Sequence, residues 1–257
     1  MLRPIIDAEP KQICIPVWDA ILPAQKAHAQ EYWLVTQADH AGLSGDIAAA
    51  LGPPLLQRFN SEVVRAIALH DDGWTPLDAQ VRVCDGKPLS FIDFDPCDFI
   101  AAWRRSIERA EKVAPIAGAM VSRHFWRLGG HRLQLNVDIH GDRELLLDFL
   151  ASEQSRQERL LAGHSHEVEF LTDVLQFCDV LSLYLCCGAT EDVEFPQKFA
   201  DQPIRLRRQT SRHGDQAAVC RVEPSPFSSA SLDLGVPARR YPPDRKPSTT
   251  MLPFLLC

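Results

Sequence analysis

The chain has 257 residues, a formal net charge of −7, 46% hydrophobic residues and 24% charged residues. These are the size and composition of an ordinary globular protein that buries a sizeable core in one domain. The acidic balance argues against a broad nucleic-acid-binding surface. No apolar run approaches the length of a membrane span, because Gln176 and Asp179 interrupt the nearest one, residues 174–187.

The cysteines point to the cellular compartment. The chain has eight of them, with neither the spacing of a disulfide framework nor a CxxC motif. Most lie in apolar surroundings and are expected to be buried free thiols, which is typical of a reducing cytoplasm. Residues 1–15 mix charges and prolines with short apolar runs, which is not the pattern of a secretory signal. We therefore expect a cytoplasmic protein.

Residues 1–35 are expected to be irregular or short-stranded, and hydrophobic periodicity then predicts mainly helices up to Gly188. The expected helices cover about 36–51, 55–71, 95–111, 115–128, 144–162 and 166–187. Prolines and glycines at 52–54 end the first helix, and Gly129 and Gly130 end the fourth. Residues 75–97 are expected to be a long loop that packs against the rest of the domain.

After Gly188 the pattern changes to short strands with turns between them, about 204–208, 218–222 and 231–236. The fold class expected is therefore mainly α, a helical bundle with a small β-containing C-terminal segment. One domain would cover residues 1–240, with its helical part at about 36–188 and its strands at about 203–236. Residues 241–257 would form a C-terminal tail.

The second expected helix ends in an imidazole and a carboxylate on its inward face. Val63, Ile67 and His70 follow helical spacing, and Asp71 comes directly after. Burying a carboxylate costs several kcal/mol unless the group is paired or bound to a metal ion. His70 and Asp71 are therefore candidate metal ligands.

Three other helices turn a metal-binding side chain inward, namely His40, His124 and Asp179. Taken alone, His124 is more typical of a hydrogen-bonded core histidine, and Asp179 is also compatible with an ion pair to a buried Arg123 or Arg156. Imidazoles and carboxylates that face one interior point from separate helices are, however, the usual basis of a metal site in a helical protein. This mixed set suits one or two ions of Fe, Mn, Zn or Co.

The order His40, His70-Asp71, Asp179 on successive helices resembles the HD superfamily of metal-dependent phosphohydrolases. More closely, the chain resembles the uncharacterised family called domain of unknown function 3891, over most of residues 30–235. The matching pieces are QADHAGLS at 37–44, AIALHDDGW at 66–74, SRHF at 122–125, EQ at 153–154 and DVLSL at 179–183.

The resemblance implies an HD-like helical bundle with a metal ion at its centre. His40, His70, Asp71 and Asp179 would be the ligands, and His124 is similar to the extra histidine of two-metal members. Many HD phosphohydrolases also place a lysine shortly after the His-Asp pair, but residues 72–75 contain no base. This departure weakens the case for phosphate-ester hydrolysis, unless Arg123 or Arg156 replaces the lysine.

The leading hypothesis is a metal-dependent hydrolase that acts on a small phosphorylated or nucleotide-like substrate through metal-activated water. Asp72 is the candidate catalytic proton shuttle. The expected substrate pocket is lined by Gln37, Trp74, Arg123, Phe125, Glu153, Gln154 and Gln157. The partner would be a small molecule, and neither nucleic acid nor a membrane.

Two alternatives stay open. One is a di-iron oxygenase on the same scaffold, which the missing lysine favours. The other is a non-catalytic HD-like module that binds a ligand or another protein. The sequence specifies neither the substrate nor the oligomeric state.

Overall fold

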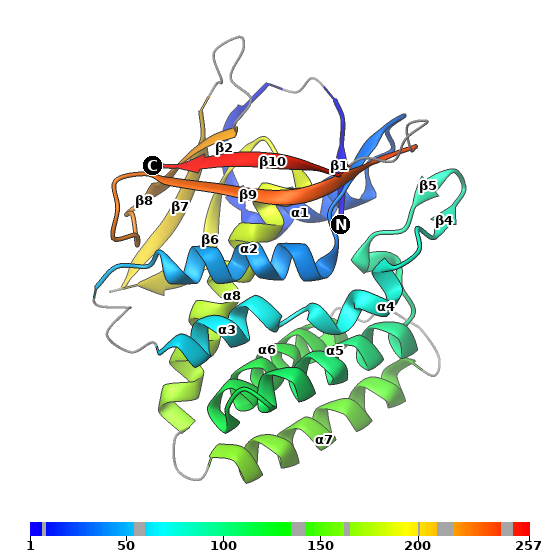
Figure 1. Ribbon diagram of the computed structural model, residues 1–257, viewed down its shortest axis with the longest axis vertical. Helices are drawn as coiled ribbons and strands as arrows, with labels where there is room; N and C mark the ends of the chain where they lie inside the picture. The colour runs from blue at the N-terminus through cyan, green and yellow to red at the C-terminus, as the bar shows by residue number, and fades with distance from the viewer. Residues whose placement is uncertain are drawn as a thin grey trace.

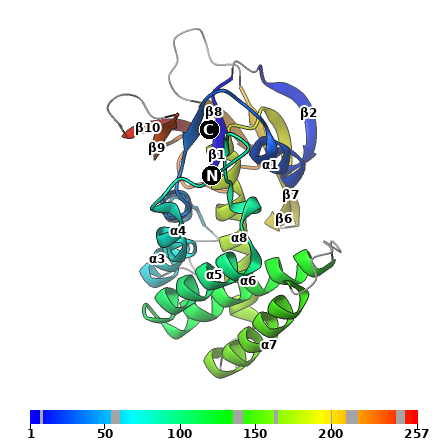
Figure 2. The ribbon, with the colours of Figure 1, turned by 90° about the vertical axis from the view of Figure 1, so that its right-hand side faces the viewer.

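A computed structural model describes residues 1–6, 9–53, 60–134, 142–161, 165–199, 201–209, 218–242 and 249–257. The molecule has two parts, which Figure 1 shows one above the other. One is a curled eight-stranded sheet that packs on a short helix. The other is a group of longer helices, of which α8 (Ser165–Cys187) runs up to the sheet (Figure 2).

The sheet is built from both ends of the chain. Its strands are β1 (Leu2–Pro4), β2 (Lys11–Pro16), β3 (Tyr32–Leu34), β6 (Glu191–Phe199), β7 (Gln202–Arg208), β8 (Ala218–Glu223), β9 (Leu232–Tyr241) and β10 (Thr249–Leu256). They lie in the order β1-β3-β9-β10-β8-β7-β6-β2. The pairs β10–β8 and β2–β6 are parallel and the other pairs are antiparallel. A separate hairpin pairs β4 (Val83–Cys84) with β5 (Lys87–Pro88).

The connection between the two edge strands requires the sheet to curl. β1 and β2 lie at opposite edges, yet Pro4 and Lys11 are only seven residues apart. Seven residues of chain reach at most about 25 Å, whereas the outer strands of a flat eight-stranded sheet lie about 34 Å apart. Helix α1 (Val17–Lys26) follows β2 directly and buries Val17, Ala20 and Ile21 in the core.

The helical part contains α2 (Gln37–Ala49), α3 (Ser61–Leu69), the 3-10 turn η2 (Asp72–Trp74), α4 (Thr75–Asp78), the 3-10 turn η3 (Phe91–Asp93), α5 (Pro96–Glu111), α6 (Pro115–Gln134) and α7 (Asp142–Leu161). Side-chain caps fix where two helices begin. Oγ1 of Thr36 accepts the N–H of Asp39 at the start of α2, and Oδ1 of Asn60 accepts the N–H of Val63 at the start of α3.

Two glycines allow the close packing that places the candidate site. A Cβ on Gly45 of α2 would lie 2.5 Å from Cβ of Ala68, so a side chain there would push α2 away from α3. A Cβ on Gly73 would lie 2.1 Å from the carbonyl oxygen of Ala102 in α5. The absence of a side chain at these two positions lets α2, α3 and η2 approach one another and α5.

Helix α8 contains a stretch, His166–Cys187, that is long and apolar enough to cross a membrane, so the expectation that no apolar run approaches this length is wrong. In this structure 83% of its apolar window is buried inside the molecule. The position of α8 in the core therefore explains why its composition is so apolar.

The expectation of a mainly α, HD-like helical bundle is wrong, because a large mixed sheet forms a major part of the fold. The sheet depends on pairing between distant segments, such as β3 with β9, which local periodicity does not report. The sequence reading also omitted α1 and β6. In addition, β10 lies within the segment that was expected to be a C-terminal tail.

Candidate metal centre

The structure brings together the five side chains that the sequence singled out as metal ligands. They lie on different elements: His40 on α2, His70 and Asp71 between α3 and η2, His124 on α6 and Asp179 on α8. All but Asp71 are buried, and Asp71 is half-buried. The convergence of separate helices on one buried point is therefore observed, although the fold around it is not the expected one.

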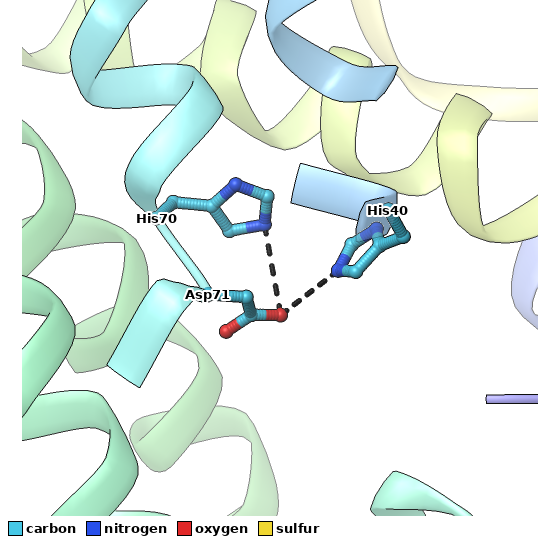
Figure 3. A group of neighbouring side chains, drawn as sticks. All are labelled: His40, His70 and Asp71. Atoms are coloured by element: carbon cyan, nitrogen blue, oxygen red, sulfur yellow. Dashed lines mark hydrogen bonds and ion pairs between the residues drawn. The ribbon is translucent and has the colours of Figure 1, made fainter. Parts of the chain in front are cut away.

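His40, His70 and Asp71 form the first group (Figure 3). Nε2 of His40 lies 2.9 Å from Oδ2 of Asp71, and Nε2 of His70 lies 3.7 Å from the same oxygen. The two imidazole rings meet edge to face, with their centroids 5.2 Å apart. One carboxylate oxygen thus faces a nitrogen atom from each of two helices.

His70, His124 and Asp179 form the second group. Oδ1 of Asp179 lies 3.3 Å from Nε2 of His70, and Oδ2 lies 3.8 Å from Nε2 of His124. In each group of three, the possible ligand atoms all lie within 4.8 Å of one another. His70 belongs to both groups, so the five residues make one continuous cluster.

Hydrogen bonds on the far side of two rings determine which nitrogen is free. Nδ1 of His70 lies 2.8 Å from the carbonyl oxygen of Ile67, so it carries the proton and donates it. Nδ1 of His40 lies 2.8 Å from Oγ of Ser182, whose hydroxyl in turn donates to the carbonyl oxygen of Asp179. Both rings therefore direct Nε2 toward the carboxylates, an arrangement typical of metal-bound histidines.

The carboxylates and burial act on the ring protons in opposite directions. Burial alone would lower the pKa of His70, but Asp71 and Asp179 outweigh it and raise the pKa to about 9. Burial lowers the pKa of His124 to about 4, with Asp179 opposing the shift. For Asp179 burial raises the pKa, but the hydrogen bond and the charge of His70 outweigh this and lower it. The two carboxylates thus favour a positive charge at His70, whereas burial disfavours one at His124.

Two atoms of the cluster lack a hydrogen-bond partner among the residues that the structure describes. They are Oδ1 of Asp71 and Nδ1 of His124. Buried polar atoms without partners are rare in folded proteins and call for an unseen water or ion. A divalent metal ion fits this set, because Nε2 lone pairs and carboxylate oxygens are its ordinary ligands.

Asp72, the expected proton shuttle, is directed elsewhere. Its carboxylate forms an ion pair with Arg109 on α5 and accepts a hydrogen bond from Oγ1 of Thr75 at 3.3 Å. The expected pocket residues Gln37 and Trp74 are buried, and they line a cavity together. Each lies three residues along the chain from a cluster residue, His40 or Asp71.

Three further expected pocket residues lie on α7. Oε2 of Glu153 accepts a hydrogen bond from Ser122 at 2.9 Å and pairs with Arg156 at 3.0 Å. Gln157 donates to the same serine hydroxyl at 3.0 Å, whereas Gln154 is exposed. Glu153 and Gln157 thus join α7 to α6 in a buried polar contact, on a different side of α6 from His124.

The other two expected pocket residues lie on α6. Arg123 pairs with Glu169 on α8 at 2.6 Å and lies over the ring of Trp126. Phe125 stacks on Trp103, with the ring centroids 5.1 Å apart, in the hydrophobic core. Neither Arg123 nor Arg156 pairs with Asp179, since Arg156 pairs with Glu111 and Glu153.

The sequence reading did not identify Ser182 as part of the site. Its hydroxyl bonds to His40 and lies 2.8 Å from Oγ of Ser44, which also donates to the carbonyl oxygen of His40. Its spacing from Asp179 could have identified it, because Ser182 lies one helical turn after Asp179 on the same face of α8.

A family model described as "Protein of unknown function (DUF3891)" matches residues 25–242, a range that contains all five cluster residues. No curated protein and no solved structure gives a significant match to the chain. The matched range covers most of the chain, including the helices that carry the cluster and most of the sheet. The chain therefore belongs to the DUF3891 family of proteins of unknown function.

Proposed function

We propose that the protein is a metal-dependent hydrolase with an HD-like centre that acts on a small phosphorylated or nucleotide-like molecule. One observation carries the proposal: His40 and His70 direct Nε2 at two carboxylates in a buried cluster that has unpartnered polar atoms. Clusters of this kind are expensive to bury unless a cation balances the carboxylates.

His40, His70, Asp71 and Asp179 would hold the ion, and His124 would complete the site or hold a second ion. When bound, such an ion supplies a Lewis acid that lowers the pKa of water and polarises a phosphoryl oxygen. Asp71 has the most exposed carboxylate of the cluster, with 13% of its side chain accessible against 5% for Asp179. We therefore infer that substrate and water reach the cluster from the Asp71 side.

The substrate proposed is a small molecule, and nucleic acid and membranes are not proposed as partners. The net charge of −7 disfavours a polyanion over a broad surface. We also propose a cytoplasmic location, because the described cysteines are all free and several are buried.

The first experiment is elemental analysis of the purified protein by plasma mass spectrometry, before and after reconstitution with Fe, Mn, Zn or Co. The test variant is His70→Ala/Asp71→Ala, and the matched control is His131→Ala/Asp148→Ala, which removes an exposed histidine and an exposed aspartate. We expect near-stoichiometric metal in the native protein and the control, and loss of metal and phosphatase turnover in the test variant. Retained metal or retained turnover in the test variant would contradict the proposal.

A di-iron oxygenase is the second candidate, favoured by the group His70, His124 and Asp179, which offers ligands for a further ion. The absence of a base at residues 72–75 also fits a substrate without phosphate. The same elemental analysis discriminates the two. Two equivalents of iron with an oxygen-sensitive optical band support the oxygenase, whereas Mn or Co with phosphatase activity supports the hydrolase.

A further inference from the structure

A small cavity lies beside the metal-ligand cluster, with a volume of about 50 Å³. Its wall includes Gln37 at the start of α2, Trp74 at the end of η2 and Asp78 in α4. Gln37 precedes His40 by three residues and Trp74 follows Asp71 by three, a displacement of about one helical turn on each element. The charges of Asp71 and His40 also reach Asp78 and act on its pKa. The cavity is therefore a neighbour of the cluster.

Two hydrogen-bond donors in the wall of this cavity are buried without a partner among the described residues. They are Nε2 of Gln37, a residue 2% exposed, and Nε1 of Trp74, a residue 4% exposed. Buried donors without a partner are rare in folded proteins, so two such donors in the wall of one cavity indicate a missing acceptor. Both atoms donate, so an acceptor oxygen of a ligand or of an ordered water would satisfy them.

The side chains of the cavity wall include two arginines and one carboxylate, Asp78, a balance that favours a negative acceptor. Arg239 on β9 and Arg82 lie at its exposed side. Arg82 is paired with Asp98, but the guanidinium of Arg239 bonds only to the carbonyl oxygen of Asp78 among the described groups, at 3.4 Å. The carboxylate of Asp78 is held by the backbone N–H of Gln37 at 2.7 Å. Arg239 is therefore available to a ligand.

The volume limits what the cavity holds. Since one water occupies about 10–15 Å³ on this measure, the cavity has room for a group of about four non-hydrogen atoms. A nucleobase or a sugar ring is too large, whereas a carboxylate or a phosphate group has the right size and the required acceptor oxygens.

We propose that this cavity is the subsite for the oxyanion end of the substrate, a carboxylate or phosphate group that Gln37 and Trp74 bind by hydrogen bonds. The role as a substrate subsite rests on the proposed function, but anion binding by the cavity does not. Arg239 attracts the anion from solvent. The metal-ligand cluster then lies next to the oxyanion end of the substrate that the cavity binds. Gln37, Trp74 and Arg239 would thereby bind the anionic group in place of the lysine that residues 72–75 lack.

The test uses the indole N–H signals of the five tryptophans in 15N-labelled protein, where Trp74→Phe assigns the Trp74 signal by its disappearance. Sodium acetate and sodium phosphate are titrated separately into metal-loaded and metal-stripped protein, with sodium chloride of equal ionic strength as reference. We expect the Trp74 signal alone to move, to saturate with acetate or phosphate, and to do so without metal. The anion that saturates it at lower concentration identifies the chemistry of the substrate end.

Gln37→Leu removes the second donor and should weaken anion binding about tenfold or more, with metal content unchanged. Gln202→Leu is the matched control, because Gln202 is exposed on β7 and is not part of the cavity wall, and it should leave binding unchanged. If Gln37→Leu does not fold, Gln37→Glu is used, and its added negative charge should abolish the shift.

Three results would overturn the subsite. They are a Trp74 signal that does not shift with either anion, a shift of equal size with chloride, or an affinity for the anion in the Gln37 variant that equals that of the native protein. A shift that needs the metal and survives Gln37→Leu would also overturn it, because the anion would then bind the metal ion itself. Native protein that takes up no metal ion overturns the proposed function alone, and the Trp74 shift in that protein still decides the subsite.

Discussion

At the scale of single residues, the hydroxyl of Ser182 determines how His40 faces the cluster. It accepts the Nδ1–H of His40 and is itself held by the carbonyl oxygen of Asp179. Groups that orient a metal-bound histidine in this way commonly contribute a factor of 10–100 to metal affinity. We expect Ser182→Ala to weaken metal binding about 10- to 100-fold while the protein stays folded, as measured by competition with a chelator.

The control for this substitution is Ser155→Ala on α7, where the exposed hydroxyl donates only to the carbonyl oxygen of Ala151 at 3.1 Å. Its metal affinity should equal that of the native protein. Equal affinities in both variants would show that Ser182 does not orient His40.

The convergence of the five cluster residues could be predicted from the sequence because each member interrupts an apolar helical face. His124 and Asp179 are conspicuous for that reason, since buried imidazoles and carboxylates need a compensating partner. The pocket residues on α7 could not be placed, because helical spacing gives the inward face of Glu153 but not the helix that it meets. Glu153 was expected to line the substrate pocket, but it is buried against Ser122 and does not contact the cluster.

At the scale of elements, ion pairs join α5 to α7. Nη1 of Arg156 lies 2.5 Å from Glu111, and Arg159 approaches the same carboxylate at 3.2 Å. Burial alone would raise the pKa of Glu111, but the two arginines outweigh it and hold the pKa below its usual value. The unfolded chain therefore binds a proton more readily than the folded one, and stability rises with pH across this range.

The stabilisation by Glu111 is fully present above its unfolded pKa, near 4.5, and is lost as the pH falls through the lower folded value. We expect Glu111→Gln to lower the free energy of unfolding at pH 7 by less than about 1 kcal/mol, because the pair is partly exposed. The difference from the native protein should shrink steadily as the pH falls below 4.5, in urea unfolding followed by circular dichroism. Glu158→Gln, an exposed change on α7, is the control, and a Glu111→Gln effect that does not shrink as the pH falls would contradict the prediction.

The helices could be predicted from the sequence far better than the strands. The observed α2, α5 and α8 begin and end close to the expected residues, because each carries a long apolar stripe and a clear cap or break. β1 and β3 have three residues each, too few for alternation to be recognised. β6 and β10 each contain a proline, Pro196 and Pro253, a residue that is uncommon inside strands and weakens the strand pattern in the sequence.

At the scale of the whole molecule, the cysteines divide by position. Cys14, Cys84 and Cys97 are exposed, whereas the four cysteines of α8 and β8 are buried. Burial raises the pKa of Cys187 and of Cys220 to about 11, so neither forms a thiolate near neutral pH.

We expect a thiol reagent such as dithionitrobenzoate to modify the three exposed cysteines rapidly in the native protein. The half-buried Cys257 should react more slowly. The buried thiols should react only in denaturant, with a total of eight. Rapid modification of all eight without denaturant would contradict the packing of α8 against the sheet.

The position of β10 has a consequence for how the protein is made. β10 lies between β9 and β8 in the middle of the sheet, yet it is translated after every strand that surrounds it. Until it leaves the ribosome, β8 and β9 each keep one row of backbone N–H and C=O groups without a strand to bind. Chains emerge from the N-terminus, so the helices that carry the metal-ligand cluster assemble beside an incomplete sheet. A nascent chain that stalls before Thr249 would present two open strand edges to chaperones and to other chains.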